Sequence, residues 1–569
     1  MKRQLFKALE ALADNHDNEV VHRDGGRVRR TWAELAHDID QAVGRLAALR
    51  PEGLEGPEGA EGRGEGRVFQ VGLIGPTSYA WMVLDLACVK AGFRSIAVPE
   101  FLTGREIADL FREAGADVVL ADRSLAGRLT EVDAPVRYFR SRHATRSATL
   151  AASPADDDFD RVDAVAWTCT ADRMLDHYST GYSSGTSGTA KRIDLTFPAE
   201  EPARPGRHLL RLAVQYYRYR TSFWSRKDNR LLVFMPFSHL QQRAFVRLAL
   251  MRRIDIVLSD PLRCVADLVV EKPNIMVSVP MIYEALAARI EQKLQQLDAR
   301  RQAVLGLYLR LRINRLGNRN PVKRLCGRYL FPTVRKIYGG RADYFVTGSA
   351  PIDPRTLTTF HRVGVRIYEG YGQSELPRII SMSSERDFRI GSVGKPRIPV
   401  RIAADGEIMV RIDRAELADP SVVTYDQDGY IHTGDLGHLD ADGFLFLHGR
   451  KDDVIVLDNG KKVFPARVET VFHELKTRHA ICVTSFDGKR LTAIAHWPDE
   501  PGGPGGREAL RGYLTEGNTH LADHEKVTLF VSAPEPFTVE NGLLTGTRKL
   551  RRPRIRAAYG EAEAERVDG

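Results

Sequence analysis

The chain has 569 residues, of which 43% are hydrophobic and 28% are charged. That length exceeds a single hydrophobic core, and that composition excludes collagen-like, disulfide-scaffold and wholly disordered proteins, so we expect two or more globular domains. The five cysteines lie far apart and show no paired spacing with histidine. They predict neither a disulfide framework nor a zinc site, and they favour a reducing, cytoplasmic location.

The first residues, MKRQLFKALEALADN, carry apolar side chains at helical spacing. They predict an amphipathic helix, because no apolar stretch among them is long enough for a signal peptide. No later apolar run approaches the roughly 20 residues that a helix needs to cross a bilayer. We therefore expect neither export nor a transmembrane segment.

Strand and helix patterns alternate from residue 31 onward. Residues 31–50 predict a helix capped by Thr31, and a Gly/Glu-rich loop at 51–66 separates it from a strand at 68–74. Helix patterns follow at 81–91 and 105–114, and strand patterns at 95–98, 117–121, 231–236, 254–258, 275–279 and 344–346. This alternation predicts an α/β fold with a largely parallel sheet.

The sequence pattern changes after residue 394. Short strands with turn signals such as DADGF and LDNGK predict a β-rich subdomain. Past Lys451, strands near 480–484, 491–496 and 527–531 predict a compact unit. We expect an N-terminal domain at 1–450, with mostly parallel sheets flanked by helices plus the β-rich subdomain, and a small α+β domain at 451–569.

Positive charge is concentrated between residues 291 and 341. This segment holds thirteen Lys or Arg and only two acidic residues, whereas the whole chain has a net charge of +9. Leucines and tyrosines recur among the arginines as in an amphipathic helix, which favours contact with an anionic membrane surface. A solvated helical insertion explains the pattern equally well, and nucleic-acid binding ranks third because no recognised module accompanies the charge.

Residues 182–191, YSSGTSGTAK, form the most informative stretch, in which seven of ten residues are Ser, Thr or Gly. Glycines let backbone N–H groups approach an anion, hydroxyls donate further hydrogen bonds, and the lysine adds positive charge, so the stretch predicts a phosphate-binding loop. It lacks the spacing of a Walker loop. On composition alone, a flexible Ser/Gly linker is the alternative.

The loop resembles the signature of the adenylate-forming superfamily, which includes acyl- and aryl-CoA synthetases, luciferases and adenylation domains. Further signatures follow in the family's order, and together they span residues 30 to 555. They are MPFSHLQQR at 235–243, VTGSAPI at 346–352, YEGYGQSELP at 368–377, the stretch from YIHTGDLG to FPARVE at 430–469, and ENGLLTGTRKLRR at 540–552.

The resemblance implies an ATP site. It puts Tyr371 against adenine, Asp435 and Arg450 beside the ribose, and the oxygens of Thr186 and Glu375 on the Mg²⁺ that ATP brings. Core packing for Tyr371 and a surface salt bridge for Glu375 are the alternatives. The full set assigned to ATP is Ser183, Ser184, Gly185, Thr186, Ser187, Gly188, Thr189, Lys191, Gly348, Ser349, Ala350, Tyr371, Gly372, Gln373, Ser374, Asp435 and Arg450.

The resemblance also implies a catalytic set of Lys549, Glu375, Thr186 and His239, with a hinge at Asp452. Attack of a carboxylate on the α-phosphate brings two anions together, and the ammonium of Lys549 would stabilise that charge. Rotation at Asp452 would carry a mobile C-terminal lid between two half-reactions. Lys549 also fits a plain charge run, and His239 also fits a histidine satisfied within the core.

Four positions depart from the family's pattern. Ala190 and Arg192 flank the loop lysine where the family has proline and glycine, and Gly546 replaces a proline close to Lys549. Ser374 also replaces the usual threonine but keeps its hydroxyl. The departures motivate one alternative, a non-catalytic protein that binds a nucleotide or acyl-AMP.

The expected substrates are a medium- to long-chain fatty acid, ATP and coenzyme A. The C-terminal motif, the basic insertion at 291–341 and the stretch KPNIMVSVPMIYEAL at 272–286 resemble long-chain acyl-CoA synthetases more than acetate or aryl ligases. A second alternative keeps adenylation but replaces coenzyme A with the phosphopantetheine arm of an acyl carrier protein.

Overall fold

A computed structural model describes most of the chain, and every structural statement below refers to that part. The described residues are 2–23, 26–51, 68–139, 158–167, 169–171, 174–175, 177–183, 191–196, 228–310, 330–348, 350, 352–373, 375–376, 378–385, 387–417, 420, 423–474, 480–498, 505–538, 541–544 and 550–567.

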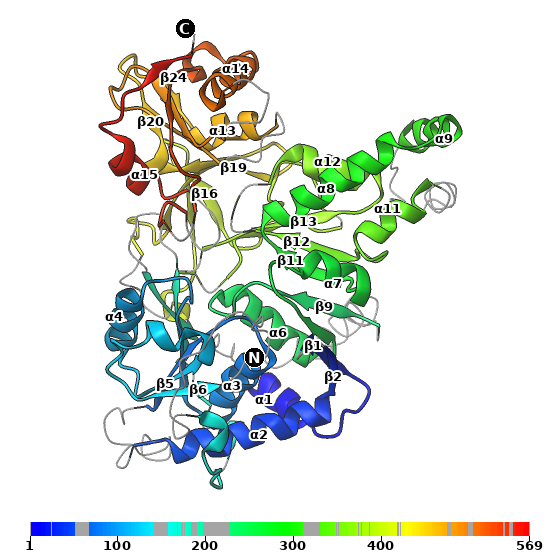
Figure 1. Cartoon of the computed structure of the whole chain (residues 1–569), viewed down its shortest axis with the longest axis vertical. Coiled ribbons are helices and arrows are strands. Elements are labelled where there is room, and N and C mark those ends of the chain that lie inside the picture. The colour runs from blue at the N-terminus through cyan, green and yellow to red at the C-terminus, as the bar shows by residue number, and fades with distance from the viewer. Residues whose placement is uncertain are drawn as a thin grey trace.

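The large sheet contains nine strands within the described residues, and its inner strands are parallel (Figure 1). Side chains alternate between its faces: Leu231 and Val233 enter one core, and Leu232 enters another. The strand order is β15 (Lys395–Pro396), β14 (Ser381–Met382), β13 (Ile367–Tyr371), β12 (Tyr344–Thr347), β11 (Ile275–Ser278), β9 (Arg230–Val233), β10 (Asp255–Leu258), β1 (Glu19–Arg23) and β2 (Arg27–Thr31).

The second sheet contains six strands of the described chain and is parallel apart from the β7–β8 hairpin. Its Val71 and Leu73 share one hydrophobic core with Leu231 of the large sheet, so the two sheets are packed together through the helices between them. The strand order is β6 (Val136–Phe139), β5 (Val118–Asp122), β3 (Gln70–Ile74), β4 (Arg94–Ala97), β7 (His177–Ser183) and β8 (Lys191–Thr196).

Helices cover these sheets on both faces. The shared core contains α1 (Lys2–Glu10), α2 (Trp32–Ala48), α3 (Tyr79–Ala91) and α6 (Leu240–Arg252). The opposite face of the large sheet packs on α7 (Cys264–Glu271), α8 (Pro280–Gln295), α11 (Pro332–Ile337) and α12 (Pro354–Arg362), and the outer face of the second sheet packs on α4 (Gly104–Ala114).

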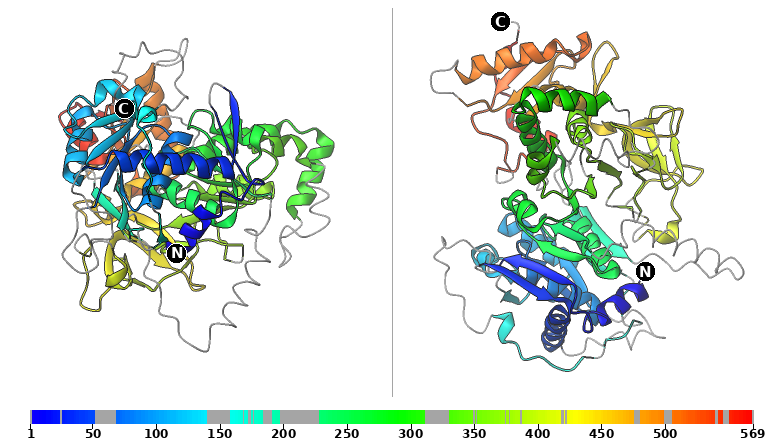
Figure 2. Two further views of the ribbon diagram at one scale, coloured as in Figure 1. Left: turned by 90° about the horizontal axis from the view of Figure 1, so that it is seen from below. Right: turned by 90° about the vertical axis from the view of Figure 1, so that its right-hand side faces the viewer.

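The β-rich part is an antiparallel sheet with its own core. Beyond Lys451, two further cores draw only on residues 455–567. Figures 1 and 2 show the C-terminal elements grouped at one end of the molecule. The antiparallel sheet orders β16 (Val400–Ile402), β17 (Glu407–Val410), β18 (Ile431–Leu439) and β19 (Leu445–Arg450). The C-terminal elements are β20 (Ile455–Val456), β21 (Lys462–Val463), α13 (Pro465–Glu474), β22 (Ile481–Thr484), β23 (Leu491–Ala495), α14 (Gly506–Asn518), β24 (Val527–Ser532), α15 (Arg552–Tyr559) and β25 (Glu565–Arg566).

The structure confirms the predicted fold class and most element positions to within one or two residues. The Thr31 side chain accepts a hydrogen bond from the Glu34 backbone N–H at 3.2 Å, and the Glu34 side chain accepts one from the Thr31 backbone N–H at 2.7 Å. This capping box starts α2. The DADGF signal forms the β18–β19 turn, where Gly443 has a φ of 80°. The described cysteines are free thiols, and no described helix is both long and apolar enough to cross a membrane.

The basic segment 291–341 contains several elements rather than one helix. It begins in the last turns of α8, continues into α9 (Ala299–Arg310) and ends after α11, and residues 311–329 lie outside the described chain. Leu297 is buried, and Val304 and Leu305 pack against the core of the large sheet. Two arginines in the first turn of α9 are exposed, Arg300 and Arg301.

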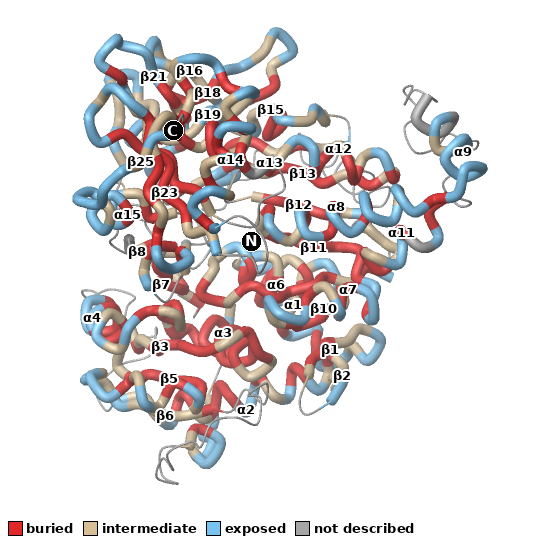
Figure 3. The backbone as a smooth tube through the Cα atoms, turned by 45° about the horizontal axis from the view of Figure 1, so that its top comes forward, coloured by how far each residue is buried: buried red, intermediate tan, exposed pale blue. Residues whose placement is uncertain are grey.

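Figure 3 shows buried backbone along β3, α3 and β11, among other elements. A buried ion cluster joins α6 to α3, β4 and β7. Arg243 of α6 donates to Asp85 of α3 (Nε to Oδ2 3.2 Å) and to the hydroxyls of Ser95 and Ser179 at 2.7 Å each. Arg247 donates to Asp85 at 3.0 Å. Burial alone would raise the pKa of Asp85, but the two guanidinium charges more than offset it and hold that pKa below its ordinary value.

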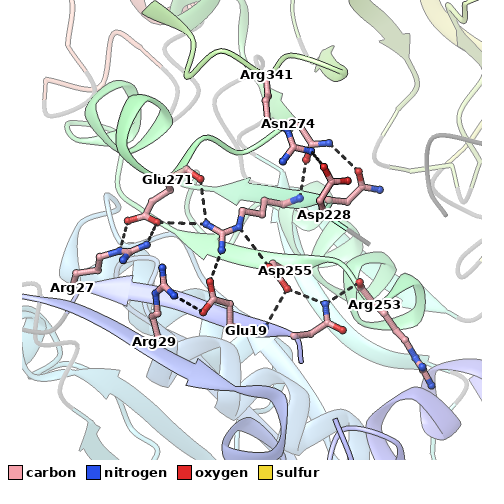
Figure 4. Close-up of polar contacts among 12 residues, drawn as sticks. Glu19, Arg27, Arg29, Asp228, Arg253, Asp255, Glu271, Asn274 and Arg341 are labelled. Carbon is pink, nitrogen blue, oxygen red and sulfur yellow. Dashed lines mark hydrogen bonds and ion pairs between the residues drawn. The ribbon is translucent and has the colours of Figure 1, made fainter. Parts of the chain in front are cut away.

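A second polar network ties the amino ends of the large sheet's parallel strands (Figure 4). Arg27 makes two hydrogen bonds to buried Glu271, at 2.6 and 2.5 Å. Arg230, the first residue of β9, contacts Glu19 at the start of β1 and lies 3.5 Å from Asp255 at the start of β10. Because these charges pair with one another at the amino edge, we infer that the network stabilises the fold.

Replacing Arg243 by methionine should lower the free energy of unfolding by about 3–5 kcal/mol, because the Asp85 carboxylate would stay buried without its main partner. Urea denaturation at pH 7, followed by tryptophan fluorescence, measures the change. Arg252→Met removes an exposed arginine from the last turn of the same helix and should cost less than about 0.5 kcal/mol. Equal effects of the two substitutions would contradict the buried-cluster account.

Candidate functional site

The predicted site residues gather where parallel strands end. Gly348 and Ala350 follow β12, Tyr371 ends β13, and Gly372 and Gln373 come directly after it. The carboxyl ends of neighbouring parallel strands meet at one edge of a sheet, and in open α/β sheets that edge is where ligands bind. His239 follows β9 at the same edge and is the N-cap residue of α6.

Four predicted residues from three strands meet in one hydrogen-bonded group, which we call the Asp435 cluster. The Tyr371 hydroxyl and the Gln373 amide donate to Asp435 Oδ2 at 2.7 and 2.8 Å. Arg450 donates to Asp435 Oδ1 at 3.2 Å, across the β18–β19 pairing. The structure thus brings together side chains that lie up to 79 positions apart in the printed sequence.

Electrostatics in the Asp435 cluster follow from burial and from this carboxylate. Burial raises the pKa of Tyr371 well above its ordinary value, and the Asp435 charge raises it further. Burial lowers the pKa of Arg450, but Asp435 more than offsets this and the net shift is upward. Both groups therefore stay protonated donors at neutral pH.

The ring of Tyr371 is 7% exposed and packs with Leu376, Ile380 and Ile408 in the core of the β-rich part. The Tyr371 ring therefore packs in a core, as the alternative for this residue predicted, and its hydroxyl donates to Asp435 in the Asp435 cluster. Its role beside adenine stays a prediction.

The predicted phosphate loop joins the two strands of the β7–β8 hairpin. Residues 184–190, including Thr186, lie outside the described chain, as do the side chains of Ser183 and Lys191. The hairpin stem is held by Asp194, which accepts from the Thr180 hydroxyl at 2.6 Å and from Arg192 at 3.1 Å. Burial would raise the pKa of Asp194, but the His177 and Thr180 hydrogen bonds hold it well below its usual range.

The hairpin stem packs directly on the start of α6. A Cβ added to Gly181 would lie 2.6 Å from a methyl group of Leu240, the residue after His239. A side chain at position 181 would therefore require the Leu240 side chain to shift. This contact puts the stem of the predicted phosphate loop next to the motif that carries His239.

The remaining predicted residues divide between described and undescribed positions. Glu375 is half-buried in the turn after β13, and its charge helps to raise the pKa of Arg450. Asp452 is exposed in a 3₁₀ turn at Lys451–Asp453. Ser349, Ser374, Gly546 and Lys549 lie outside the described residues. In the described chain, no group of three or more His, Cys, Asp or Glu is arranged to hold a metal, and the predicted Mg²⁺ ligand Thr186 falls outside it.

Sequence reasoning missed several residues around the site. Lys451, beside the predicted hinge, lies 2.6 Å from Asp405 and 2.9 Å from Glu407. Arg552, three positions after Lys549, makes two hydrogen bonds to Glu469 at 2.7 and 2.5 Å. These partners are distant in sequence, so only the long-range pairing of elements reveals them.

Glu369 is a further missed residue, two positions before Tyr371 on β13 and 9% exposed. Burial raises its pKa to about 8 from an ordinary value of 4.5. The folded protein therefore keeps this proton up to about pH 8, whereas the unfolded chain releases it near pH 4.5. By linkage, this group lowers stability progressively as pH rises through that window.

Replacing Glu369 by glutamine should remove this penalty. The unfolding free energy of the variant, minus that of the wild type, should therefore rise between pH 5 and 8, by up to about 1.4 kcal/mol per pH unit. Urea denaturation at several pH values measures the difference. Glu385→Gln, at an exposed position, is the control and should give a flat line. A flat line for Glu369→Gln would contradict a buried, protonated carboxyl.

Comparison with known proteins finds relatives over most of the chain. The long-chain-fatty-acid–CoA ligase FadD15 of Mycobacterium bovis is 28% identical over 594 residues, covering 96% of this chain and 93% of that protein. Human long-chain-fatty-acid–CoA ligase 1 is 26% identical over 384 residues, covering 58% of this chain and 53% of that protein.

Solved structures share the fold. ATP-bound MatB from Rhodopseudomonas palustris superposes with a TM-score of 0.65 at 19% identity, covering 99% of each chain. The anthranilate CoA ligase AuaEII in complex with anthranoyl-AMP superposes with a TM-score of 0.64 at 17% identity, covering 97% of this chain and 96% of that one. The model of the family described as AMP-binding enzyme matches residues 9–409, so the chain belongs to this family.

Proposed function

We propose that this protein activates a medium- to long-chain fatty acid with ATP and passes the acyl group to coenzyme A. The observation that carries the proposal is the Asp435 cluster, in which Tyr371, Gln373 and Arg450 converge on one carboxylate at the carboxyl edge of the sheets. Relatives named long-chain-fatty-acid–CoA ligases, at 24–28% identity, support the fatty acid as the substrate class.

The nucleotide would bind along this edge. Asp435 would accept hydrogen bonds from ribose hydroxyls, and Arg450 would donate to the same sugar. Backbone N–H groups and hydroxyls of 183–189, with Lys191, would hold the phosphates. The segment at Gly348, Ser349 and Ala350 and the segment at Gly372, Gln373 and Ser374 would line the nucleotide and acyl pockets. The oxygens of Thr186 and Glu375 would hold Mg²⁺, which supplies charge neutralisation to the triphosphate when bound.

Two transfers complete the reaction. A carboxylate oxygen of the fatty acid attacks the α-phosphorus of ATP, the bond to the β-phosphate oxygen breaks, and pyrophosphate leaves. The thiol sulfur of coenzyme A then attacks the acyl carbon, its proton is lost, and AMP leaves with the oxygen it gained. Lys549 would stabilise charge in the first transfer, and His239 would border the carboxylate.

A division of labour between domains follows from this proposal. Residues 1–450 would form the nucleotide- and acyl-binding domain, and residues 451–569 the mobile lid. Cores that draw only on residues after 451 support this boundary. Rotation at Asp452 would present Lys549 for adenylation and another lid face for thioester formation.

We further propose that the basic side of the protein docks on anionic membranes, from which a fatty acid would be collected. On α7 and just before it, Leu262 is 93% exposed, Val270 58% and Val269 39%. The exposed cations Arg263 and Lys272 flank them. Exposed apolar side chains near exposed cations in the same stretch of chain suit the headgroup region of an anionic bilayer.

Helix α11 adds cations to the same surface. A Cβ on Gly339 would lie 2.2 Å from the Leu268 carbonyl oxygen, so the end of α11 packs on α7. Arg335 and Lys336 of α11 are exposed. Figure 1 shows α7, α11 and α9 on one side of the molecule.

The proposed chemistry predicts that palmitate or laurate, ATP and Mg²⁺ release pyrophosphate, and that coenzyme A is then converted to a thioester. Lys549→Ala should lower acid-dependent exchange of pyrophosphate into ATP by at least about 100-fold, because the charge formed at the α-phosphate loses its cation. A panel of acids from acetate to stearate, scored by pyrophosphate release, measures chain-length preference.

The acceptor is tested in the same assay with either coenzyme A or a holo acyl carrier protein. Formation of a thioester on coenzyme A supports the proposal. If a thioester forms rapidly on the carrier protein alone, the acceptor is the carrier protein and not coenzyme A. Absence of acid-dependent exchange in the wild type would instead favour a non-catalytic nucleotide-binding protein.

The membrane proposal predicts that the protein sediments with vesicles of phosphatidylcholine and phosphatidylglycerol but not with phosphatidylcholine alone. Leu262→Glu/Val270→Glu should weaken this binding about tenfold or more, because it removes apolar burial and adds negative charge. Val456→Glu, at a 59% exposed site in the C-terminal unit, is the matched control. Equal binding by all proteins would contradict docking through α7.

A further inference from the structure

The predicted hinge residue is bracketed by two ion-paired anchors. Upstream, the ammonium of Lys451 lies 2.6 Å from Asp405 and 2.9 Å from Glu407 of the β-rich part. The Glu407 side chain is only 5% exposed, and its other oxygen accepts from the Gly434 backbone at 2.9 Å. Position 451 is thus held to β17, whose Glu407 in turn binds the backbone of β18, the strand that carries Asp435.

Downstream, the anchor belongs to the C-terminal unit. Asp453 lies 3.7 Å from Nε of Arg552. The same guanidinium makes two hydrogen bonds to Glu469 of α13, at 2.7 and 2.5 Å, and donates to the Val483 carbonyl of β22 at 3.2 Å. The Arg552 side chain is 15% exposed and that of Glu469 is 8% exposed. A planar guanidinium held on three sides has little freedom to move.

Arg552 also lies close to the proposed catalytic lysine in the chain. Leu544 and Leu550 form a β-bridge, and the Arg551 backbone donates to the Leu543 carbonyl at 2.9 Å. These contacts close the two ends of the segment that includes Lys549, which itself lies outside the described residues. Arg552 is the next residue after Arg551 and is the first residue of α15.

We infer that Arg552 is a positioning residue: it fixes the start of α15, three positions after Lys549, to α13, to β22 and to the residue beside the hinge. Rotation at Asp452 would then deliver the lysine in a set place. This inference rests on the proposed function. The anchor on Lys451 keeps position 451 on the nucleotide-binding side, and the anchor on Asp453 keeps position 453 with the lid. The rotation is thereby confined to the exposed Asp452 between them.

The test separates the two half-reactions. Pyrophosphate exchange measures adenylation, and conversion of synthetic acyl-adenylate plus coenzyme A to thioester measures the second step. Arg552→Gln should slow adenylation by about 100-fold, because a displacement of about 1 Å of a catalytic group costs this much. Thioester formation should stay within about threefold, because it does not use Lys549. Arg552→Lys keeps the charge but not the two-pronged geometry and should restore only part of the rate.

Controls distinguish positioning from plain stability. Arg556→Gln, at an exposed position of the same helix, should change neither half-reaction. Lys451→Met weakens the anchor that both lid positions share, so it should slow both half-reactions by similar factors. If Arg552→Gln slows both equally, together with a lower Tm, or slows neither, the inference is overturned. If Lys549→Ala keeps normal exchange, the proposed role of Lys549 fails instead.

Discussion

The buried contact of Arg243 and Arg247 with Asp85 is the constraint on which the site geometry depends. Apolar packing joins the two large sheets but is non-directional, and it does not by itself set how α6 sits against β4 and β7. Hydrogen bonds from one guanidinium to Asp85, Ser95 and Ser179 do set it, because each bond has a required distance and angle. As a result, these hydrogen bonds fix the position of the hairpin that carries the predicted phosphate loop relative to the motif that contains His239.

The two edges of the large sheet use charge in different ways. At the amino edge, arginines and carboxylates pair with one another, so their charges are neutralised within the fold (Figure 4). At the carboxyl edge, Tyr371 and Gln373 meet Asp435 of β18, which accepts three hydrogen bonds, whereas a carboxylate offers about four acceptor positions. If Asp435 binds the ribose as proposed, one ribose hydroxyl would therefore bind it directly. A second hydroxyl would have to displace Tyr371 or Gln373, or accept a hydrogen bond from Arg450.

Local patterns in the sequence predicted the elements, because alternation, capping boxes and turn signals act over a few residues. The helix capped by Thr31 and the turn at Gly443 are examples. The site was predicted through motifs that occur as continuous stretches. Pairings such as Asp85 with Arg243, or Glu469 with Arg552, join positions far apart, and no local pattern specifies which charge meets which. The raised pKa of Glu369 likewise follows from burial that its own strand does not reveal.

The departure at Arg192 illustrates how such pairing changes the meaning of a sequence difference. An extra arginine beside a phosphate loop would be expected to strengthen its hold on an anion. In the hairpin, Arg192 donates to Asp194, which also accepts from Thr180 and contacts His177 at 3.0 Å. Its charge is therefore paired within β8, with the carboxylate that also binds Thr180 and His177 of β7. In the proposed phosphate site, Lys191 would then supply the positive charge, as in a loop with glycine at position 192.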